Sequence, residues 1–221
     1  MSHRAAVRHL RRADPVMRRI IERVGPCLLH ERVQTNRLRA LVVAIISQQI
    51  SWHAARTVEA RFCALYGCDS TDQHAKFPEP ERILATPVRK LRSAGLSRQK
   101  VRYIRDIAAR ASSGELPLAR LGRMNDVAIM ERLTAVKGIG RWTAEIFMLI
   151  SLGRPDVLPV DDLGIQHAIR LAYGLRRMPS EKKMLELSEV WKPYRSVASW
   201  YLWRSRRAQS NAAKKGKVAS G

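Results

Sequence analysis

Apolar residues recur at helical spacing along most of the chain, with short breaks at proline and glycine. The clearest example is the segment 38–46, in which Leu, Val and Ile would share one face of a helix that starts near Thr35 or Asn36. The alternation of period two that marks half-buried strands is not found. The pattern therefore predicts an all-α fold.

Capping residues mark where several of these helices begin and end. Asp14-Pro15 places a capping side chain before a proline at the first helical position, which predicts a helix to about Gly25. Thr86-Pro87 repeats this signature, with Gly95 as the stop. Further helices are expected at about 97–111, 126–137, 141–152, 180–191 and 193–206.

The sequence Lys-Gly-Ile-Gly-Arg separates two of the predicted helices. Gly138 and Gly140 allow a tight turn, since glycine tolerates positive φ, and Ile139 between them can enter the core. Free N–H groups at the start of the following helix favour an anion such as a phosphate. Lys137 and Arg141 flank the turn and add positive charge.

About twenty residues beyond this turn the chain carries two adjacent carboxylates, Asp161 and Asp162, after an apolar segment that contains Pro159. Taken by itself, the pair marks the start of a helix, where an aspartate caps free N–H groups.

Positive charge dominates the composition. Lys and Arg total 41 against 19 Asp and Glu, a formal net charge of +22, which favours a polyanionic partner: DNA, RNA or an anionic membrane surface. No apolar run approaches the about 18 residues of a membrane span, so no membrane partner is expected. Cys27, Cys63 and Cys68 lack metal-site spacing, so we expect reduced thiols, no side-chain metal site and an intracellular protein.

Two more segments complete a recognisable pattern. Ser47-Gln48-Gln49-Ile50-Ser51 interrupts the apolar stripe, and an aromatic-rich segment runs from Trp191 to Trp203. With the glycine turn and the Asp161-Asp162 pair, they resemble the helix-hairpin-helix (HhH-GPD) DNA glycosylase superfamily. Within it, the chain is similar to the 3-methyladenine DNA glycosylase II family, in the compact form that lacks an N-terminal α/β domain.

The resemblance covers about residues 9–204 and implies two helical lobes with a DNA-binding cleft between them. One lobe would comprise 36–139, ending in the hairpin, and the other 1–35 with 140–206. Residues 207–221 are polar and basic, and we expect a disordered tail.

The resemblance also assigns the chemistry. Its catalytic aspartate falls on Asp162, beneath the sugar, where a carboxylate stabilises the positive charge that develops as an N-glycosidic bond breaks. Whether Asp162 also activates the water stays open. Trp142 stands where lyases of the superfamily carry a Schiff-base lysine, and three cysteines are too few for an iron–sulfur cluster. A monofunctional glycosylase without a cofactor is therefore expected.

The remaining roles are carried over by position. Trp142 and Trp203 would line the base pocket, and Gln49 and Ile50 would enter DNA in place of the extruded base. The family's hairpin binds the DNA backbone, here through Lys137, Gly138, Gly140 and Arg141. No role is assigned to Ser51 or Trp52, and Trp191 and Trp200 are expected in the core.

The sequence thus predicts a monomeric enzyme of base excision repair that excises alkylated purines, 3-methyladenine and 7-methylguanine, from double-stranded DNA. A bacterial nucleoid is favoured over a eukaryotic nucleus. Two alternatives stay open. The chain could be a non-catalytic protein that binds damaged DNA on the same scaffold, or a glycosylase for neutral deaminated purines such as hypoxanthine.

Overall fold

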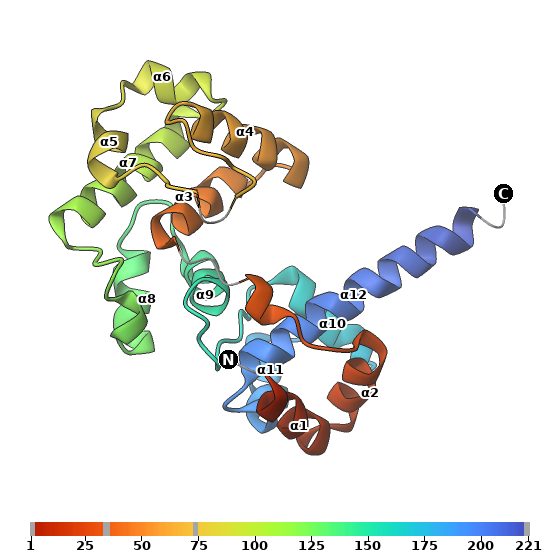
Figure 1. The fold of residues 1–221 in the computed structure, drawn as a ribbon. Helices are drawn as coiled ribbons and strands as arrows, with labels where there is room; N and C mark the ends of the chain where they lie inside the picture. Colours follow the sequence, from red (N-terminus) through yellow and green to blue (C-terminus); the bar gives the residue numbers. More distant parts are fainter. Residues whose placement is uncertain (1–2, 33–35, 73–74, 219–221) are drawn as a thin grey trace. The chain divides into compact units, whose positions relative to one another are not determined.

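A computed structural model describes residues 3–32, 36–72 and 75–218 (Figure 1). Throughout these residues the regular elements are α-helices and short 3-10 helices, without a strand, so the predicted all-α fold is confirmed. The chain forms two compact units. The central unit is Gln34–Leu152, and the terminal unit combines Met1–Val33 with Gly153–Gly221.

Each unit is a cluster of helices. The central unit contains α3 (Arg37–Ser47), α4 (Trp52–Ala64), α5 (Pro80–Ala85), α6 (Val88–Ser93), α7 (Arg98–Ser113), η2 (Leu121–Arg123), α8 (Asp126–Thr134) and α9 (Arg141–Ile150). The terminal unit contains α1 (Arg4–Ala13), α2 (Pro15–Val24), η1 (Leu29–Arg32), α10 (Leu163–Ala172), α11 (Glu181–Ser188), η3 (Glu189–Trp191) and α12 (Arg195–Val218).

Helix α3 is the centre of the central unit and packs against α4, α7 and α9. Its apolar stripe is fully buried, including Leu41 and Ile45. One polar side chain on α3 is buried as well: Arg39 pairs with Glu59 of α4 at 3.1 Å and donates to the carbonyl of Ser70 at 2.5 Å. Because a buried charge must be paired, this ion pair ties α3, α4 and the loop after α4 to one another.

The boundary between the units differs from the predicted one. The hairpin was expected to close the first lobe at residue 139, with residues from 140 onward in the second lobe. Instead α9 stays in the central unit, because its buried face, with Phe147 and Leu149, contributes to a core shared with α3 and α8.

Asp14 organises the terminal unit. It caps α2, as the sequence predicted, because its Oδ1 accepts from the N–H groups of Val16 at 2.7 Å and Met17 at 3.1 Å. Its Oδ2 accepts from the Trp191 indole at 2.8 Å and from the Tyr173 hydroxyl. The carboxylate is 5% exposed and thus joins α2, α10 and η3 inside the core.

Helix α12 departs from expectation at its end. Trp191 and Trp200 are buried, as predicted. The backbone of α12 continues as helix to Val218, where the sequence suggested disorder from residue 207. The alanine, lysine and glutamine residues of this segment favour helix, which explains the difference.

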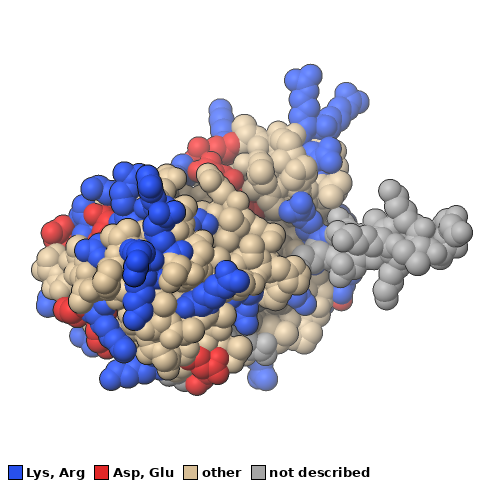
Figure 2. All heavy atoms as spheres, turned by 90° about the horizontal axis from the view of Figure 1, so that it is seen from above, with Lys and Arg blue, Asp and Glu red and all other residues tan. Residues whose placement is uncertain are grey.

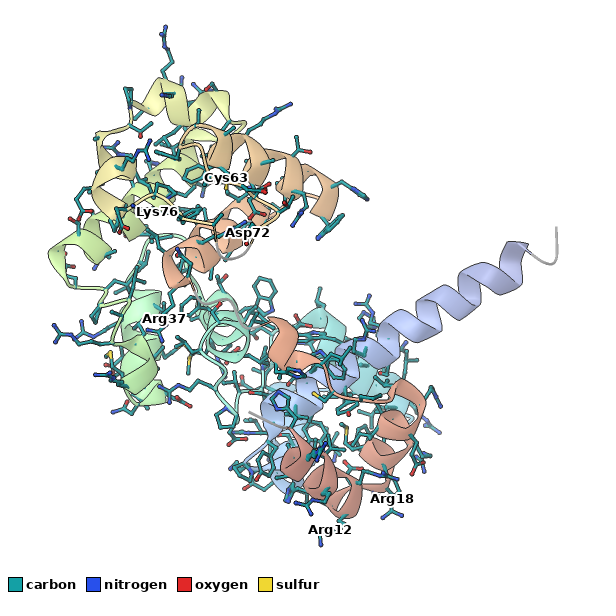
Figure 3. All side chains as sticks on the ribbon, viewed as in Figure 1. Arg12, Arg18, Arg37, Cys63, Asp72 and Lys76 are labelled. Atoms are coloured by element: carbon teal, nitrogen blue, oxygen red, sulfur yellow. The ribbon has the colours of Figure 1, made fainter. Side chains whose placement is uncertain are left out.

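The first two helices of the terminal unit carry basic side chains on their outer side. Figure 3 shows Arg12 of α1 and Arg18 of α2 pointing outward.

Asp14→Asn tests the role of this carboxylate. Asparagine keeps an oxygen for the α2 cap but turns an amide toward the hydroxyl and indole donors, so we expect a loss of about 2–4 kcal/mol in the free energy of unfolding. Urea denaturation measures it. The control is the same substitution at an exposed aspartate: Asp161→Asn should change the free energy of unfolding by less than about 0.5 kcal/mol. Equal stability of the Asp14 variant and wild type would contradict the assignment.

Candidate active site and DNA-binding hairpin

The turn between α8 and α9 requires glycine at one position. Gly138 has φ +84°, a left-handed conformation, and a Cβ placed on it would lie 2.2 Å from the Tyr103 ring of α7. No real Cβ makes such a contact, so the ring packs directly on the backbone of the turn. Ile139, 3% exposed, enters the core as the sequence predicted.

This turn presents unused N–H groups. Within the described residues, the amides of Gly138 and Gly140 have no acceptor, and Gly140 begins α9 without a side-chain cap. The amide of Lys137 is engaged, because it donates to the Asp106 carboxylate at 2.9 Å, while the Lys137 side chain is exposed. The start of α9 therefore offers N–H groups and a helix dipole to an anion.

Arg141 adds positive charge beside these amides. Its guanidinium is half-exposed and donates to Glu145, one turn further along α9, at 3.1 Å. Lys and Arg are also far more abundant than Asp and Glu on the face shown in Figure 2. Such a surface attracts a polyanion over a long range.

The segment after α3 is fixed to the hairpin turn. The side-chain amide of Gln48 donates to the carbonyl of Gly138 at 2.8 Å. Lys100 of α7 donates its ammonium to the carbonyls of Ile46 at 2.6 Å and Gln48 at 2.8 Å. Burial lowers the pKa of Lys100. Three interactions thus hold the end of α3 in one position.

Gln49 and Ile50 follow from this anchor. Gln49 has φ +58°, the one non-glycine residue with positive φ in the described part of the chain, and such strain is typical of functional positions. The side chain of Ile50 is 39% exposed instead of packed in the core. The positive φ of Gln49 and the exposure of Ile50 are both consistent with residues that contact a partner molecule instead of packing in the core.

Trp142 and Gln49 line one pocket of about 530 Å³ between α3 and α9. Its wall is largely apolar, with Val43 and Ile146 among the lining residues. Trp142 is 42% exposed, so its ring can contact a molecule that enters the pocket. The structure therefore brings together two residues that the sequence assigned to different roles.

In the terminal unit, Asp162 caps α10. Its Oδ1 accepts from the N–H of Ile165 at 2.8 Å and from the indole N–H of Trp203 at 2.9 Å. Asp162 is half-buried, whereas Asp161 is exposed. These two N–H groups, one from α10 and one from α12, orient the carboxylate.

Gly164 protects this arrangement. A Cβ at this position would lie 2.9 Å from Oδ1 of Asp162 and 3.4 Å from Cδ1 of Trp203. Any other residue would push the carboxylate or the indole aside.

The predicted site residues form two groups. The hairpin with Gln49, Ile50 and Trp142 lies in the central unit, and Asp162 with Trp203 lies in the terminal unit.

The residues that support the central group were not predicted from the sequence. Nothing in the sequence around Lys100 shows that it binds carbonyls more than fifty positions away. The contact of Tyr103 with Gly138 has no sequence signal either, because it depends on tertiary packing.

Among the residues that the structure describes, His, Cys, Asp and Glu do not gather in threes at a possible metal site. Over the same residues, every helix is too short or too polar to cross a membrane.

A family model described as the HhH-GPD superfamily of base excision DNA repair proteins matches residues 42–193. The chain belongs to this superfamily. DNA-3-methyladenine glycosylase 1 of Schizosaccharomyces pombe is 33% identical over 199 residues, which are 89% of this chain and 85% of that protein. This degree of similarity places the chain in the 3-methyladenine DNA glycosylase family, as the sequence predicted.

Two solved structures of the family share this fold. The crystal structure of a Bacillus halodurans DNA-3-methyladenine glycosidase aligns with a TM-score of 0.83 and 33% identity, covering 96% of this chain and 94% of that one. The 3-methyladenine DNA glycosylase of S. pombe in complex with abasic DNA aligns with a TM-score of 0.78, also at 33% identity, covering 90% and 95%.

Gly138→Ala tests the hairpin. The new Cβ meets the Tyr103 ring and the positive φ is strained, so we expect a loss of about 2 kcal/mol or more in unfolding free energy. Gly140→Ala is the matched control. It has φ −87° and no heavy atom within 4 Å of the new Cβ, so its stability should stay within about 0.5 kcal/mol of wild type. Equal effects of the two changes in urea denaturation would contradict this account.

Gln49→Gly tests the strained position. Glycine adopts this φ freely, so we expect a gain of about 0.5–1 kcal/mol in stability together with weaker base extrusion. Urea denaturation measures the first, and fluorescence of 2-aminopurine in duplex DNA measures the second. Gln49→Ala removes the side chain but keeps the strain, so it should lose extrusion without the gain. If Gln49→Gly lowered the free energy of unfolding, the claim that the backbone at Gln49 is strained would be wrong.

Proposed function

We propose that this HhH-GPD protein hydrolyses the N-glycosidic bond of alkylated purines, 3-methyladenine and 7-methylguanine, in double-stranded DNA. The observation that carries the proposal is the carboxylate of Asp162, half-buried and fixed by the N–H groups of Ile165 and Trp203. The similarity to a DNA-3-methyladenine glycosylase of S. pombe, and to the structure of the S. pombe enzyme with abasic DNA, supports it.

Asp162 acts on the sugar. As the bond to the base breaks, positive charge builds on the deoxyribose, and a fixed carboxylate beside it lowers the energy of that transition state. The same group is able to orient the attacking water. An alkylated purine of this kind carries positive charge, so it leaves readily without a general acid. The reaction consumes only water and takes no cofactor.

Trp142 and the pocket receive the base. The base must leave the helical stack before the carboxylate reaches its sugar, and the Gln49–Ile50 segment takes the vacated space. The Trp142 ring lines an apolar pocket. A cationic purine over an indole face gains about 0.5–2 kcal/mol relative to a neutral one. Trp203, whose indole is hydrogen-bonded to Asp162, stays our prediction for a second ring that contacts the base.

The hairpin holds the backbone. The amides of Gly138 and Gly140 and the side chains of Lys137 and Arg141 bind a phosphate without reading bases. Trp142 stands where a lyase would need a lysine, so the enzyme leaves an abasic site in an intact strand. Relatives come from bacteria and yeasts alike. A monomer acting in a bacterial nucleoid stays our prediction.

Asp162→Asn tests the catalytic assignment. Asparagine presents an oxygen to Ile165 and Trp203, so the fold and DNA binding should persist while the negative charge is lost. We expect release of 3-methyladenine and 7-methylguanine from methylated DNA to fall by at least about 100-fold, since removing one electrostatic group from an active site has effects of that size. Chromatography of the released bases measures it.

Asp161→Asn is the control, because this neighbouring carboxylate is exposed. It should excise like wild type. Full activity of the Asp162 variant would overturn the assignment. Absence of release by the wild-type protein, with DNA binding intact, would favour the non-catalytic alternative. Faster release from hypoxanthine duplexes than from methylated ones would favour the deaminated-purine alternative.

A further inference from the structure

Trp52 has no role in the function proposed above, yet its exposure is unusual. The side chain is 68% exposed, the highest value for any Trp, Tyr or Phe in the described part of the chain. Trp191 and Trp200, by comparison, are buried. A large exposed aromatic ring is costly to hydrate, which marks it as a candidate contact.

Trp52 is exposed although it lies on the face of α4 that packs into the core. Trp52 lies on the same face of α4 as Ala55, Glu59 and Phe62, which are all buried in the core of the central unit. The packing face of α4 thus extends past the end of that core, and Trp52 continues it.

Its position is also fixed. Ser51 caps α4, accepting from the N–H of Ala54 at 3.2 Å, so Trp52 begins the first turn of a regular helix. Ile50, exposed as well, lies two residues before it. Trp52 is therefore held next to the segment that we propose enters DNA.

Charge around the ring favours a nucleic acid as the occupant. The guanidinium of Arg56 lies over the Trp52 ring, 5.7 Å from its centroid, and His53 meets it edge-on at 5.0 Å between centroids. An aromatic ring flanked by a cation is the combination that binds nucleotides, by stacking and by phosphate neutralisation. A single ring is too small for a stable protein interface, which buries about 1,200–2,000 Å².

We propose that Trp52 packs its ring against a nucleotide of the duplex next to the extruded one, while Arg56 neutralises a phosphate beside it. The inference rests on the proposed function for the DNA substrate. It adds an aromatic contact outside the base pocket, placed beside the Gln49–Ile50 segment. Its contribution is affinity for the opened duplex, before any bond is broken.

The test uses equilibrium binding of a fluorescent duplex that contains a tetrahydrofuran abasic-site analogue. Trp52→Leu should bind about 5- to 100-fold more weakly than wild type, the range found when base-stacking aromatic side chains are removed. Trp52→Phe keeps a ring and should stay within about threefold. Val127→Ala, an apolar change at a position 70% exposed on α8, is the control and should bind like wild type.

Salt dependence separates stacking from charge. Trp52→Leu should lower affinity by the same factor at every salt concentration, so the slope of log K against log salt is unchanged. Arg56→Gln should reduce that slope by about 0.9, the change expected for one lost phosphate contact. Since Trp52 is exposed, urea denaturation should show both variants as stable as wild type.

The outcomes distinguish this inference from the proposed function. Wild-type binding by Trp52→Leu, with base excision intact in the wild type, overturns the inference alone. Weaker binding by Trp52→Leu with no excision by the wild type supports the contact and overturns the enzymatic proposal. Unchanged DNA binding together with loss of a dimer in sedimentation would show a contact between copies and overturn the inference.

Discussion

The absence of a side chain at Gly138 is the constraint on which the central unit's candidate site depends. It lets the Tyr103 ring lie directly on the turn, which fixes the direction in which α9 leaves the hairpin and exposes its first N–H groups. The carbonyl of the same residue accepts the Gln48 amide, so the end of α3 is held by the turn as well. Trp142, on the first turn of α9, is positioned by the same contact. One backbone surface thus positions both the exposed amides at the start of α9 and the wall of the pocket.

In the terminal unit, carboxylates rather than a glycine fix where two helices begin. Asp14 and Asp162 each begin a helix and each accept an indole N–H from a later segment, Trp191 in one case and Trp203 in the other. Their surroundings separate their roles. Asp14 is buried and joins three elements, whereas Asp162 is half-buried and keeps contact with the outside. The same local chemistry serves packing at Asp14, and at Asp162 it orients the carboxylate that we propose acts on the sugar.

What the sequence predicted well was local or carried by a motif. The start of α2 followed from Asp14-Pro15, because a cap and a first-turn proline act within one turn, and Gly138 was identified from the glycine pattern of the hairpin. The grouping of α9 with the central unit was missed, since only its contacts with α3 and α8 decide it. Lys100 was missed for the same reason, as its partners lie far along the chain. Residues that hold a site in place are harder to predict than residues that form it, because their partners are set by tertiary structure.

The terminal unit is assembled from two separate stretches of sequence, one before and one after the segment that forms the central unit. During synthesis on the ribosome, all of the central unit emerges before Asp162, and Asp162 emerges about forty residues before its partner Trp203. The hairpin is therefore able to fold while the Asp162 carboxylate has its local partner Ile165 but still lacks the indole of Trp203. Translation order thus lets the hairpin turn form before the second hydrogen bond to Asp162, which requires that α12 has left the exit tunnel.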